Sequence, residues 1–170
     1  MKIFLDTADV LLIKPAYETG LLDGVTTNPS LILKSGRQLL EVIKEIESGF
    51  PTLTSISAEV VADTSEEMLT QAKQYYSIAP AVTIKVPCTV EGLKSCKFLT
   101  DVGVQVNVTL VFTVAQAILA SKAGATFISP FVGRWMDNSI DGIELIKNIR
   151  KAFDLSGTKT QILAASIRDV

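Results

Sequence analysis

The most informative absence in this sequence of 170 residues is histidine, which does not occur at all. Its absence excludes the Ser-His-Asp and Cys-His forms of nucleophilic catalysis and removes the commonest metal ligand. Any acid–base chemistry must therefore depend on carboxylates, lysine, tyrosine, hydroxyl groups or bound water.

Cysteine, basic charge and long apolar runs are also scarce. The two cysteines, Cys88 and Cys96, lie in one predicted loop–helix segment and do not indicate a disulfide framework. A formal net charge of -2 provides no broad basic surface, so we expect no nucleic-acid partner. No stretch approaches the roughly 20 apolar residues of a membrane span, and the sequence opens on a strand-like run instead of a basic leader. We therefore expect a cytoplasmic protein with no membrane association.

What the sequence does contain is enough apolar material for one packed core. Hydrophobic residues make up 48% of the chain and charged residues 20%, which is typical of a globular protein. No linker rich in Pro, Gly or Ser divides the chain. We expect residues 1–170 to form a single domain, because the chain is too short for two ordinary ones.

Short β-rich runs alternate with longer helical segments along the chain. Pro29 suits the first turn of a helix, and Thr64 with Glu67 predicts a capping box. Strict alternation of strand and helix predicts right-handed crossovers and a parallel sheet. Strands are expected near residues 2–6, 23–27, 53–60, 81–86, 104–109, 125–129 and 160–166. Helices are expected near residues 8–19, 29–49, 64–78, 90–102, 113–123 and 139–155.

The pattern within the strands separates a closed barrel from an open, doubly wound sheet. Interior strands of an open sheet are covered on both faces and read as continuous apolar runs. Here Val106 and Val108 alternate with Asn107 and Thr109 along one predicted strand. Successive side chains point to opposite faces, so such a strand has an apolar face for helices and a polar face for a shared interior. The pattern favours an α/β fold of the (β/α)8 barrel type.

Polar residues cluster where such a barrel builds its active site, at the C-terminal ends of the strands. They are Asp6, Asn28, Glu59, Lys85, Asn107, Thr109, Ser129 and Ser166. A structural explanation competes with a catalytic one, because the set would also serve as a polar plug in which Lys85 only pairs with Glu59 or Asp6. Buried polar groups destabilise a fold unless they are used or fully satisfied, so we favour a functional site for the set as a whole.

Lys85 is the strongest candidate for chemistry. It lies between Ile84 and Val86 on a predicted buried strand, where desolvation disfavours the ammonium and leaves some neutral amine to attack a carbonyl. The resulting protonated imine is itself an electron sink, so we expect neither a metal nor an organic cofactor. Proton transfers would then fall to Asp6 and Glu59, helped by Thr109 or a water.

Two arginines follow predicted strand ends and suggest a phosphate site. Arg134 comes after Ser129, and Arg168 comes after Ser166. Arginine binds phosphate in a bidentate manner, and a phosphate held away from the imine would fix the reacting carbons in place.

Six segments carry these residues in order along the chain. They are Phe4–Asp9 (FLDTAD), Gly24–Ser30 (GVTTNPS), Ile84–Thr89 (IKVPCT), Asn107–Thr109 (NVT), Ile128–Arg134 (ISPFVGR) and Ala164–Arg168 (AASIR). In this order they resemble the transaldolase family, particularly its small-subunit members, which are similar to fructose-6-phosphate aldolases. The resemblance covers the chain from end to end.

The resemblance implies a class I aldolase barrel, a metal-free mechanism, sugar-phosphate substrates and a homo-oligomer. It also implies a role in the pentose phosphate pathway. In the catalytic set, Lys85 would form an imine with a ketose phosphate, Asp6 would take the C4 hydroxyl proton, and Glu59 with Thr109 would move protons through a water. The substrate-binding set would comprise Thr27, Asn28, Asn107, Ser129, Phe131, Arg134, Ser166 and Arg168.

Two positions favour transfer of the three-carbon unit over its release. Similar fructose-6-phosphate aldolases carry glutamine at the position of Glu59 and tyrosine at that of Phe131. An apolar Phe131 cannot polarise a water as a phenol does, so the intermediate is expected to await an aldose acceptor. An aldolase that releases dihydroxyacetone is the nearest alternative.

The end of the sequence departs from the family pattern. Seven strands are expected before Val170, so the last strand and the last two helices of a full barrel would be missing. A second alternative follows, in which the chain is an inactive remnant that binds sugar phosphates or only oligomerises. The intact catalytic set opposes this alternative, namely Asp6, Glu59, Lys85, Asn107 and Thr109.

Overall fold

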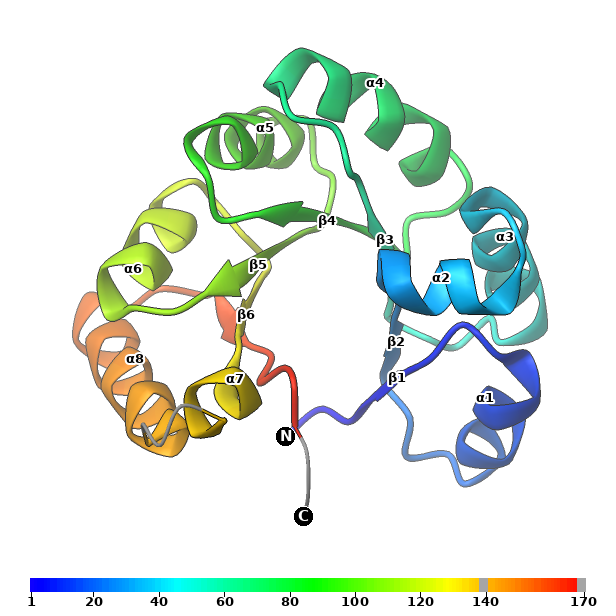
Figure 1. Cartoon of the computed structure of the whole chain (residues 1–170), viewed down its shortest axis with the longest axis horizontal. Helices are drawn as coiled ribbons and strands as arrows, with labels where there is room; N and C mark the ends of the chain where they lie inside the picture. Colours follow the sequence, from blue (N-terminus) through cyan, green and yellow to red (C-terminus); the bar gives the residue numbers. More distant parts are fainter. Residues whose placement is uncertain (138–140, 168–170) are drawn as a thin grey trace.

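The computed structural model describes residues 1–137 and 141–167 and contains a curled parallel sheet. Its strands lie in chain order, each beside the next, with helices on the outside of the curve (Figure 1). This arrangement is that of a (β/α)8 barrel, of which seven strands are present, and it confirms the expected fold class. The strands are β1 (Phe4–Asp6), β2 (Gly24–Thr26), β3 (Ser55–Glu59), β4 (Val82–Pro87), β5 (Val106–Val111), β6 (Phe127–Pro130) and β7 (Gln161–Ile162).

Side-chain caps fix where most of the helices begin. At six helices an Asp, Asn or Thr accepts a hydrogen bond from a backbone N–H of the first turn. No helix within the described ranges is long and apolar enough to cross a membrane. The helices are α1 (Val10–Glu18), α2 (Pro29–Ser35), α3 (Leu39–Gly49), α4 (Ser65–Tyr76), α5 (Val90–Asp101), α6 (Val114–Lys122), α7 (Val132–Met136) and α8 (Gly142–Ser156).

The prediction of one helix over residues 29–49 is wrong, because the segment forms α2 and α3. Gly36 ends α2 with a φ of 68°, a left-handed conformation that glycine adopts without steric cost. Residues 34–38 (KSGRQ) contain no apolar side chain, and a glycine after Ser35 is a typical helix-end signal, so the break was readable from the sequence. The predicted capping box is also incomplete. Thr64 accepts from the Glu67 N–H, but the Glu67 carboxylate accepts from the Thr64 hydroxyl at 2.8 Å instead of bonding the backbone.

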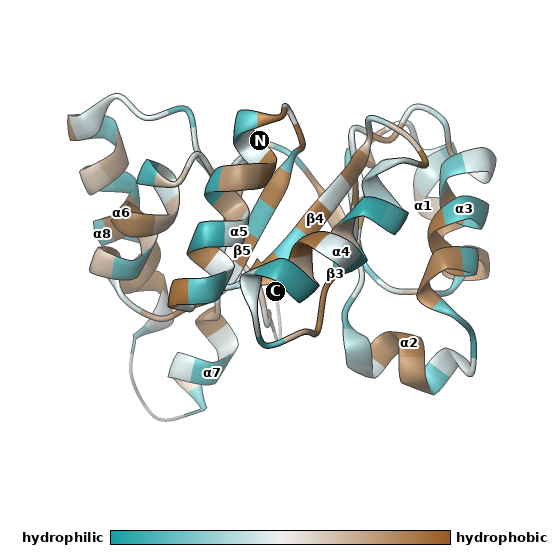
Figure 2. Ribbon diagram, turned by 90° about the horizontal axis from the view of Figure 1, so that it is seen from above, coloured by the Kyte–Doolittle hydropathy of each residue, from teal (hydrophilic) through white to brown (hydrophobic). Residues whose placement is uncertain are grey.

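Two further differences lie near the C-terminal end. The strand predicted over residues 160–166 is paired only over β7, with one isolated bridge between Ala165 and Phe131. The short helix α7 was not predicted. Helix α8 corresponds to the predicted segment 139–155, of which residues 139 and 140 lie outside the described ranges. Figure 2 shows α2 and α7 at the same end of the molecule, where each follows the C-terminal end of a strand.

The two faces of the strands are chemically different, as the alternation predicted. Ile84, Val106 and Val108 are fully buried in the apolar core. The inner face carries small polar residues, among them Ser55 and Thr83, whose hydroxyls hydrogen-bond at 2.7 Å. The curl also brings distant strands together, since the rings of Phe4 on β1 and Phe127 on β6 meet edge to face with centroids 5.6 Å apart. The apolar layer therefore joins sheet to helices, and the polar layer lies inside the curve.

Gly92 tests how tightly α5 packs against the strand that carries Lys85. A Cβ atom at Gly92 would overlap the Pro87 carbonyl at the end of β4. We predict that Gly92→Ala lowers the free energy of unfolding by about 1–3 kcal/mol or more, as overpacking does. Gly49→Ala is the control, because no atom lies within 4 Å of the added methyl at the end of α3. Urea denaturation of both variants measures the difference, and equal stability would contradict the close packing of α5 on β4.

Candidate active site

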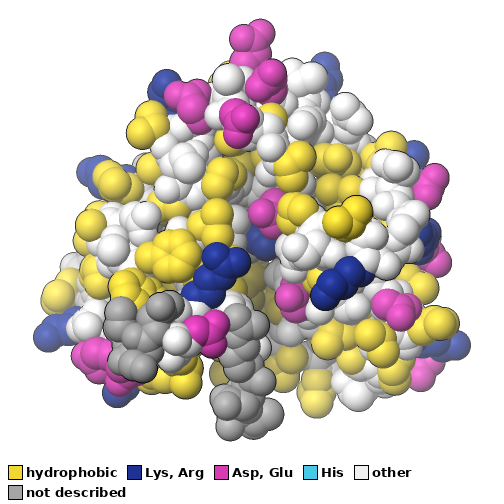
Figure 3. All heavy atoms as spheres, viewed as in Figure 1, with side chains coloured by type: hydrophobic (Ala, Val, Ile, Leu, Met, Phe, Trp, Pro, Cys, Tyr) yellow, Lys and Arg dark blue, Asp and Glu magenta, His cyan; other side chains and the backbone are white. Residues whose placement is uncertain are grey.

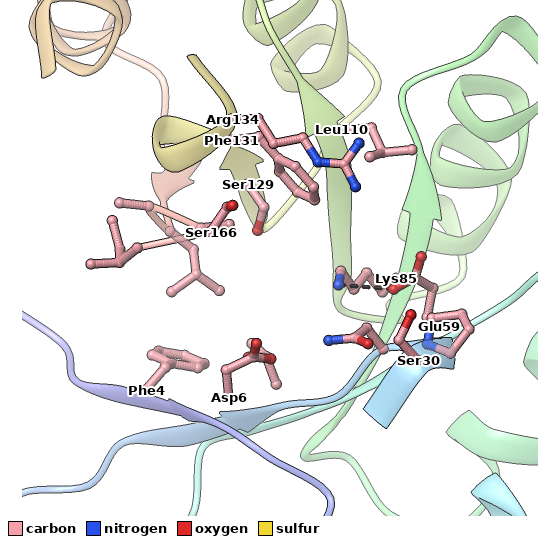
Figure 4. Close-up of a pocket in the computed structure, with 17 residues that line it drawn as sticks. Phe4, Asp6, Ser30, Glu59, Lys85, Leu110, Ser129, Phe131, Arg134 and Ser166 are labelled. Carbon is pink, nitrogen blue, oxygen red and sulfur yellow. Dashed lines mark hydrogen bonds and ion pairs between the residues drawn. The ribbon is translucent and has the colours of Figure 1, made fainter. Parts of the chain in front are cut away.

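A pocket opens at the C-terminal ends of the strands, inside the curve of the sheet. Its volume is about 620 Å³. Figure 3 shows a hollow on this face with acidic and basic side chains near its centre, and Figure 4 shows the side chains that line it. The predicted site residues in its lining are Asp6, Asn28, Glu59, Lys85, Ser129, Phe131, Arg134 and Ser166. The structure thus brings together residues that the sequence separates by up to 160 positions.

Lys85 and Glu59 form an ion pair beside the pocket. The strand register places Glu59 of β3 opposite Lys85 of β4 on the same face. The Lys85 Nζ lies 2.8 Å from the Glu59 Oε2 and donates a longer hydrogen bond, 3.4 Å, to the Thr27 carbonyl. Only 7% of Lys85 is exposed. A buried pair of this kind is also what the structural explanation requires, so the pairing alone does not decide between plug and active site.

Several buried polar atoms near this pair have no hydrogen-bond partner in the part of the chain that the structure describes. They include the hydroxyl of Ser57, the amide nitrogen of Asn107 and the hydroxyl of Thr109. Glu59 Oε2 also makes no hydrogen bond of good geometry, so its attraction to Lys85 is mainly electrostatic. Unpartnered buried groups destabilise a fold by about 1–3 kcal/mol each. Such atoms are therefore available to a substrate or a bound water, as a closed polar plug would not allow.

Asn107 and Thr109 are not among the residues that line the pocket. Both are fully buried on β5, at 0% and 1% exposure. The Ser129 hydroxyl donates to Asn107 Oδ1 at 3.0 Å, which leaves the amide nitrogen of Asn107 as the unpartnered group.

The remaining predicted residues have well-defined local partners. Asp6 Oδ1 accepts from the Thr26 hydroxyl at 2.7 Å, which holds the Asp6 carboxylate at the end of β1. Asn28 lines the pocket while its side-chain oxygen caps α2 by accepting from the Leu31 N–H at 3.0 Å. Thr27 does not reach the pocket, since its buried hydroxyl donates to the Ser57 carbonyl at 2.7 Å. The structure therefore gives the Thr27 hydroxyl a partner on β3, and the substrate contact expected of Thr27 stays a prediction.

Candidate phosphate-binding groups gather on the opposite side of the pocket from Asp6 (Figure 4). Ser129, Arg134 and Ser166 all line this part of the pocket. The Arg134 guanidinium carbon lies 5.4 Å from the centre of the Phe131 ring, which is a cation–π contact. Arg168, the other predicted phosphate ligand, lies outside the described residues.

Leu110 also lines the pocket, although sequence reasoning did not select it. If side chains alternated regularly along β5, Leu110 would lie on the same face as Val106 and Val108, which face the helices. No signal in the sequence distinguishes Leu110 from these neighbours.

Neither cysteine is an activated nucleophile. Burial raises the pKa of the Cys88 thiol, and burial followed by the proximity of Cys88 raises the pKa of Cys96 to about 12. Thiols with raised pKa values hold little thiolate near neutral pH. Lys85 is thus the nucleophile candidate at this end of the sheet.

Comparison with known proteins agrees with the geometry. The family model described as transaldolase/fructose-6-phosphate aldolase matches residues 3–170. The chain belongs to this family. The expected resemblance is thereby confirmed.

Curated relatives support the same assignment. A probable transaldolase of Paracoccus denitrificans is 56% identical over 170 residues, which are 100% of this chain and 77% of that protein. A probable transaldolase of Chelativorans sp. is 57% identical over 170 residues, with the same coverage. One from Cereibacter sphaeroides is 55% identical over 168 residues, which are 99% of this chain and 76% of that protein. The chain therefore spans about three quarters of the length of these family members.

The buried pair between Glu59 and Lys85 predicts a strong energetic coupling. Glu59→Gln and Lys85→Met should each lower the free energy of unfolding, because each leaves one charge buried without its partner. The double variant should be more stable than the sum of the single effects predicts, by about 1–3 kcal/mol. Urea denaturation of the four proteins gives this value. Additive effects would show that the two charges are independent.

Proposed function

We propose that the chain is a transaldolase, which moves a dihydroxyacetone unit from a ketose phosphate to an aldose phosphate through an imine at Lys85. The observation that carries the proposal is a nearly buried lysine, 2.8 Å from a carboxylate, at an open pocket. Fructose 6-phosphate or sedoheptulose 7-phosphate would be the donor, which would place the enzyme in the pentose phosphate pathway. The names of the relatives support the activity.

In the first half of the reaction the donor sugar is cleaved. Glu59 accepts a proton from the Lys85 ammonium, and the free amine attacks C2 of the ketose. Glu59 returns its proton to the C2 oxygen, which leaves as water and gives a protonated imine. Asp6 then takes the C4 hydroxyl proton, the C3–C4 bond breaks, and its electron pair moves to the imine nitrogen. An aldose leaves, and the three-carbon enamine stays on Lys85.

In the second half the same groups act in reverse. C3 of the enamine attacks the aldehyde carbon of the acceptor, and Asp6 returns a proton to the new hydroxyl. Water then adds to the imine carbon and frees Lys85. The unpartnered hydroxyl of Thr109 and the Glu59 carboxylate are suited to hold this water. No metal or organic cofactor is needed, because the protonated imine accepts the electrons.

The substrate would extend across the pocket between two polar ends. Asn28 and Asn107 would orient the dihydroxyacetone unit near Lys85. Ser129, Arg134 and Ser166 would hold the phosphate, together with Arg168. We further propose that residues 1–170 act as one domain in a cytoplasmic homo-oligomer, as the resemblance to small-subunit members implies.

Borohydride trapping tests the imine. Incubation with fructose 6-phosphate and borohydride should leave a reduced three-carbon or six-carbon adduct on the Lys85 peptide, detected by mass spectrometry. Lys85→Met should abolish the adduct. Lys97→Met should not, because Lys97 lies exposed on α5 in an ion pair with Asp101. A folded chain without an adduct, or with an adduct on another lysine, would overturn the proposal.

Assays with and without an aldose acceptor distinguish transfer of the three-carbon unit from its release. With fructose 6-phosphate and erythrose 4-phosphate we expect a seven-carbon product, and without the aldose only slow formation of free dihydroxyacetone. Phe131→Tyr should raise the rate of release by about tenfold or more, because the phenol can position a water and exchange its proton. Equal release from both proteins would contradict the role given to Phe131. Rapid release by the unsubstituted protein would favour the aldolase alternative.

A further inference from the structure

A β-bulge in β5 turns Leu110 from the helix side of the sheet into the pocket. Val108 is paired with Ile128 and Val111 with Pro130, so three steps along β5 match two along β6. One extra residue lies between them. Val108 and Val111 both have 0% exposure in the core, whereas Leu110 lies outside the core and lines the pocket. Bulges beside functional sites commonly re-aim a side chain in this way.

The backbone of Leu110 is strained by this arrangement. Its φ is 59°, in the left-handed region that a bulky side chain rarely adopts. In the described ranges only one other residue besides glycine has a positive φ, namely Ser166, and it lines the same pocket. Strained residues that gather at one site indicate that the site, and not the packing of the fold, requires the conformation.

Leu110 lies on the same side of the pocket as Arg134. Figure 4 shows the Arg134 guanidinium between the Phe131 ring and the Leu110 side chain, above Lys85. The contact with Phe131 is a cation–π interaction at 5.4 Å. Phe131 is in turn held edge to face against Phe112, with ring centroids 5.7 Å apart. The cation–π contact fixes one side of the guanidinium, and in Figure 4 its other end points toward the Leu110 side chain.

We infer that Leu110 is a positioning residue for Arg134. The bulge places an apolar side chain opposite the Phe131 ring, so that the guanidinium is held with its donors toward the sugar phosphate. A phosphate needs this orientation because bidentate hydrogen bonds are geometrically specific. The role rests on the proposed phosphate site. It adds a residue that does not itself touch the phosphate.

Binding of glucitol 6-phosphate tests this role without the reaction, because this hexose phosphate analogue has no carbonyl group and cannot form an imine. Its dissociation constant is measured by calorimetry for the unsubstituted chain, Leu110→Ala, Arg134→Gln and the double variant. We expect Leu110→Ala to weaken binding about tenfold, the loss that follows when one charge-assisted hydrogen bond is misdirected. In the Arg134→Gln background the same change should have no further effect, and unphosphorylated glucitol should not distinguish the variants.

A melting comparison tests the strain independently. At an ordinary strand position glycine is less stable than alanine. At a left-handed position the order reverses, so Leu110→Gly should melt above Leu110→Ala by a few degrees. The usual order would show that Leu110 is not strained and would remove the basis of the inference.

The remaining outcomes are also decisive. Unchanged glucitol 6-phosphate binding in Leu110→Ala, an equal loss in the Arg134→Gln background, or no binding by the unsubstituted chain would each overturn the positioning role. Failure of the proposed function has a separate signature, which is the absence of a borohydride adduct on Lys85 in the unsubstituted chain. An adduct together with unchanged binding in Leu110→Ala would retain the transaldolase and reject the role of Leu110.

Discussion

The register between β3 and β4 is the constraint on which the rest of the site depends. It puts Glu59 opposite Lys85 on the inner face, so that the two charges meet where little water reaches them. A lone charge in that position would strongly destabilise the fold, whereas a paired one is tolerated. A slip of one residue would turn every inner side chain of β3 toward the helices. The same hydrogen bonds that hold the sheet together therefore also decide whether a lysine can lie at the floor of the pocket.

The far side of the pocket depends on a local departure from regular strand geometry. Leu110 and Ser166 both have a φ of 59°. A left-handed conformation costs a residue with a side chain roughly 1–2 kcal/mol, and the surrounding sheet must supply this energy. The pocket thus combines a regular floor, set by strand register, with a strained wall at the bulge of β5.

Alternation of side chains explains why much of the site was predictable from the sequence. A strand that exposes Val106 and Val108 to helices must turn Asn107 and Thr109 inward, and the same logic selected Lys85. The predictions failed where the backbone departs from regular strand or helix geometry. Nothing in the pattern shows the extra residue that re-aims Leu110. The break at Gly36 was missed although residues 34–38 contain no apolar side chain. The motif around Thr27 likewise does not show that its buried hydroxyl bonds the Ser57 carbonyl on β3.

Two layers inside the sheet bear on the choice between a structural plug and a working site. In the lower layer, the hydroxyls of Ser55 and Thr83 satisfy each other at 2.7 Å, as a structural interior requires. In the upper layer, polar atoms of Ser57, Asn107 and Thr109 stay without partners in the described part of the chain. The sequence uses the same small polar residues in both layers, so composition does not explain the difference. Trp135 Nε1 is also without a partner among the described residues, but it belongs to α7 and not to the sheet. Stability alone would favour closing the open groups of the inner face. The open polar groups on the inner face therefore favour a working site over a closed plug.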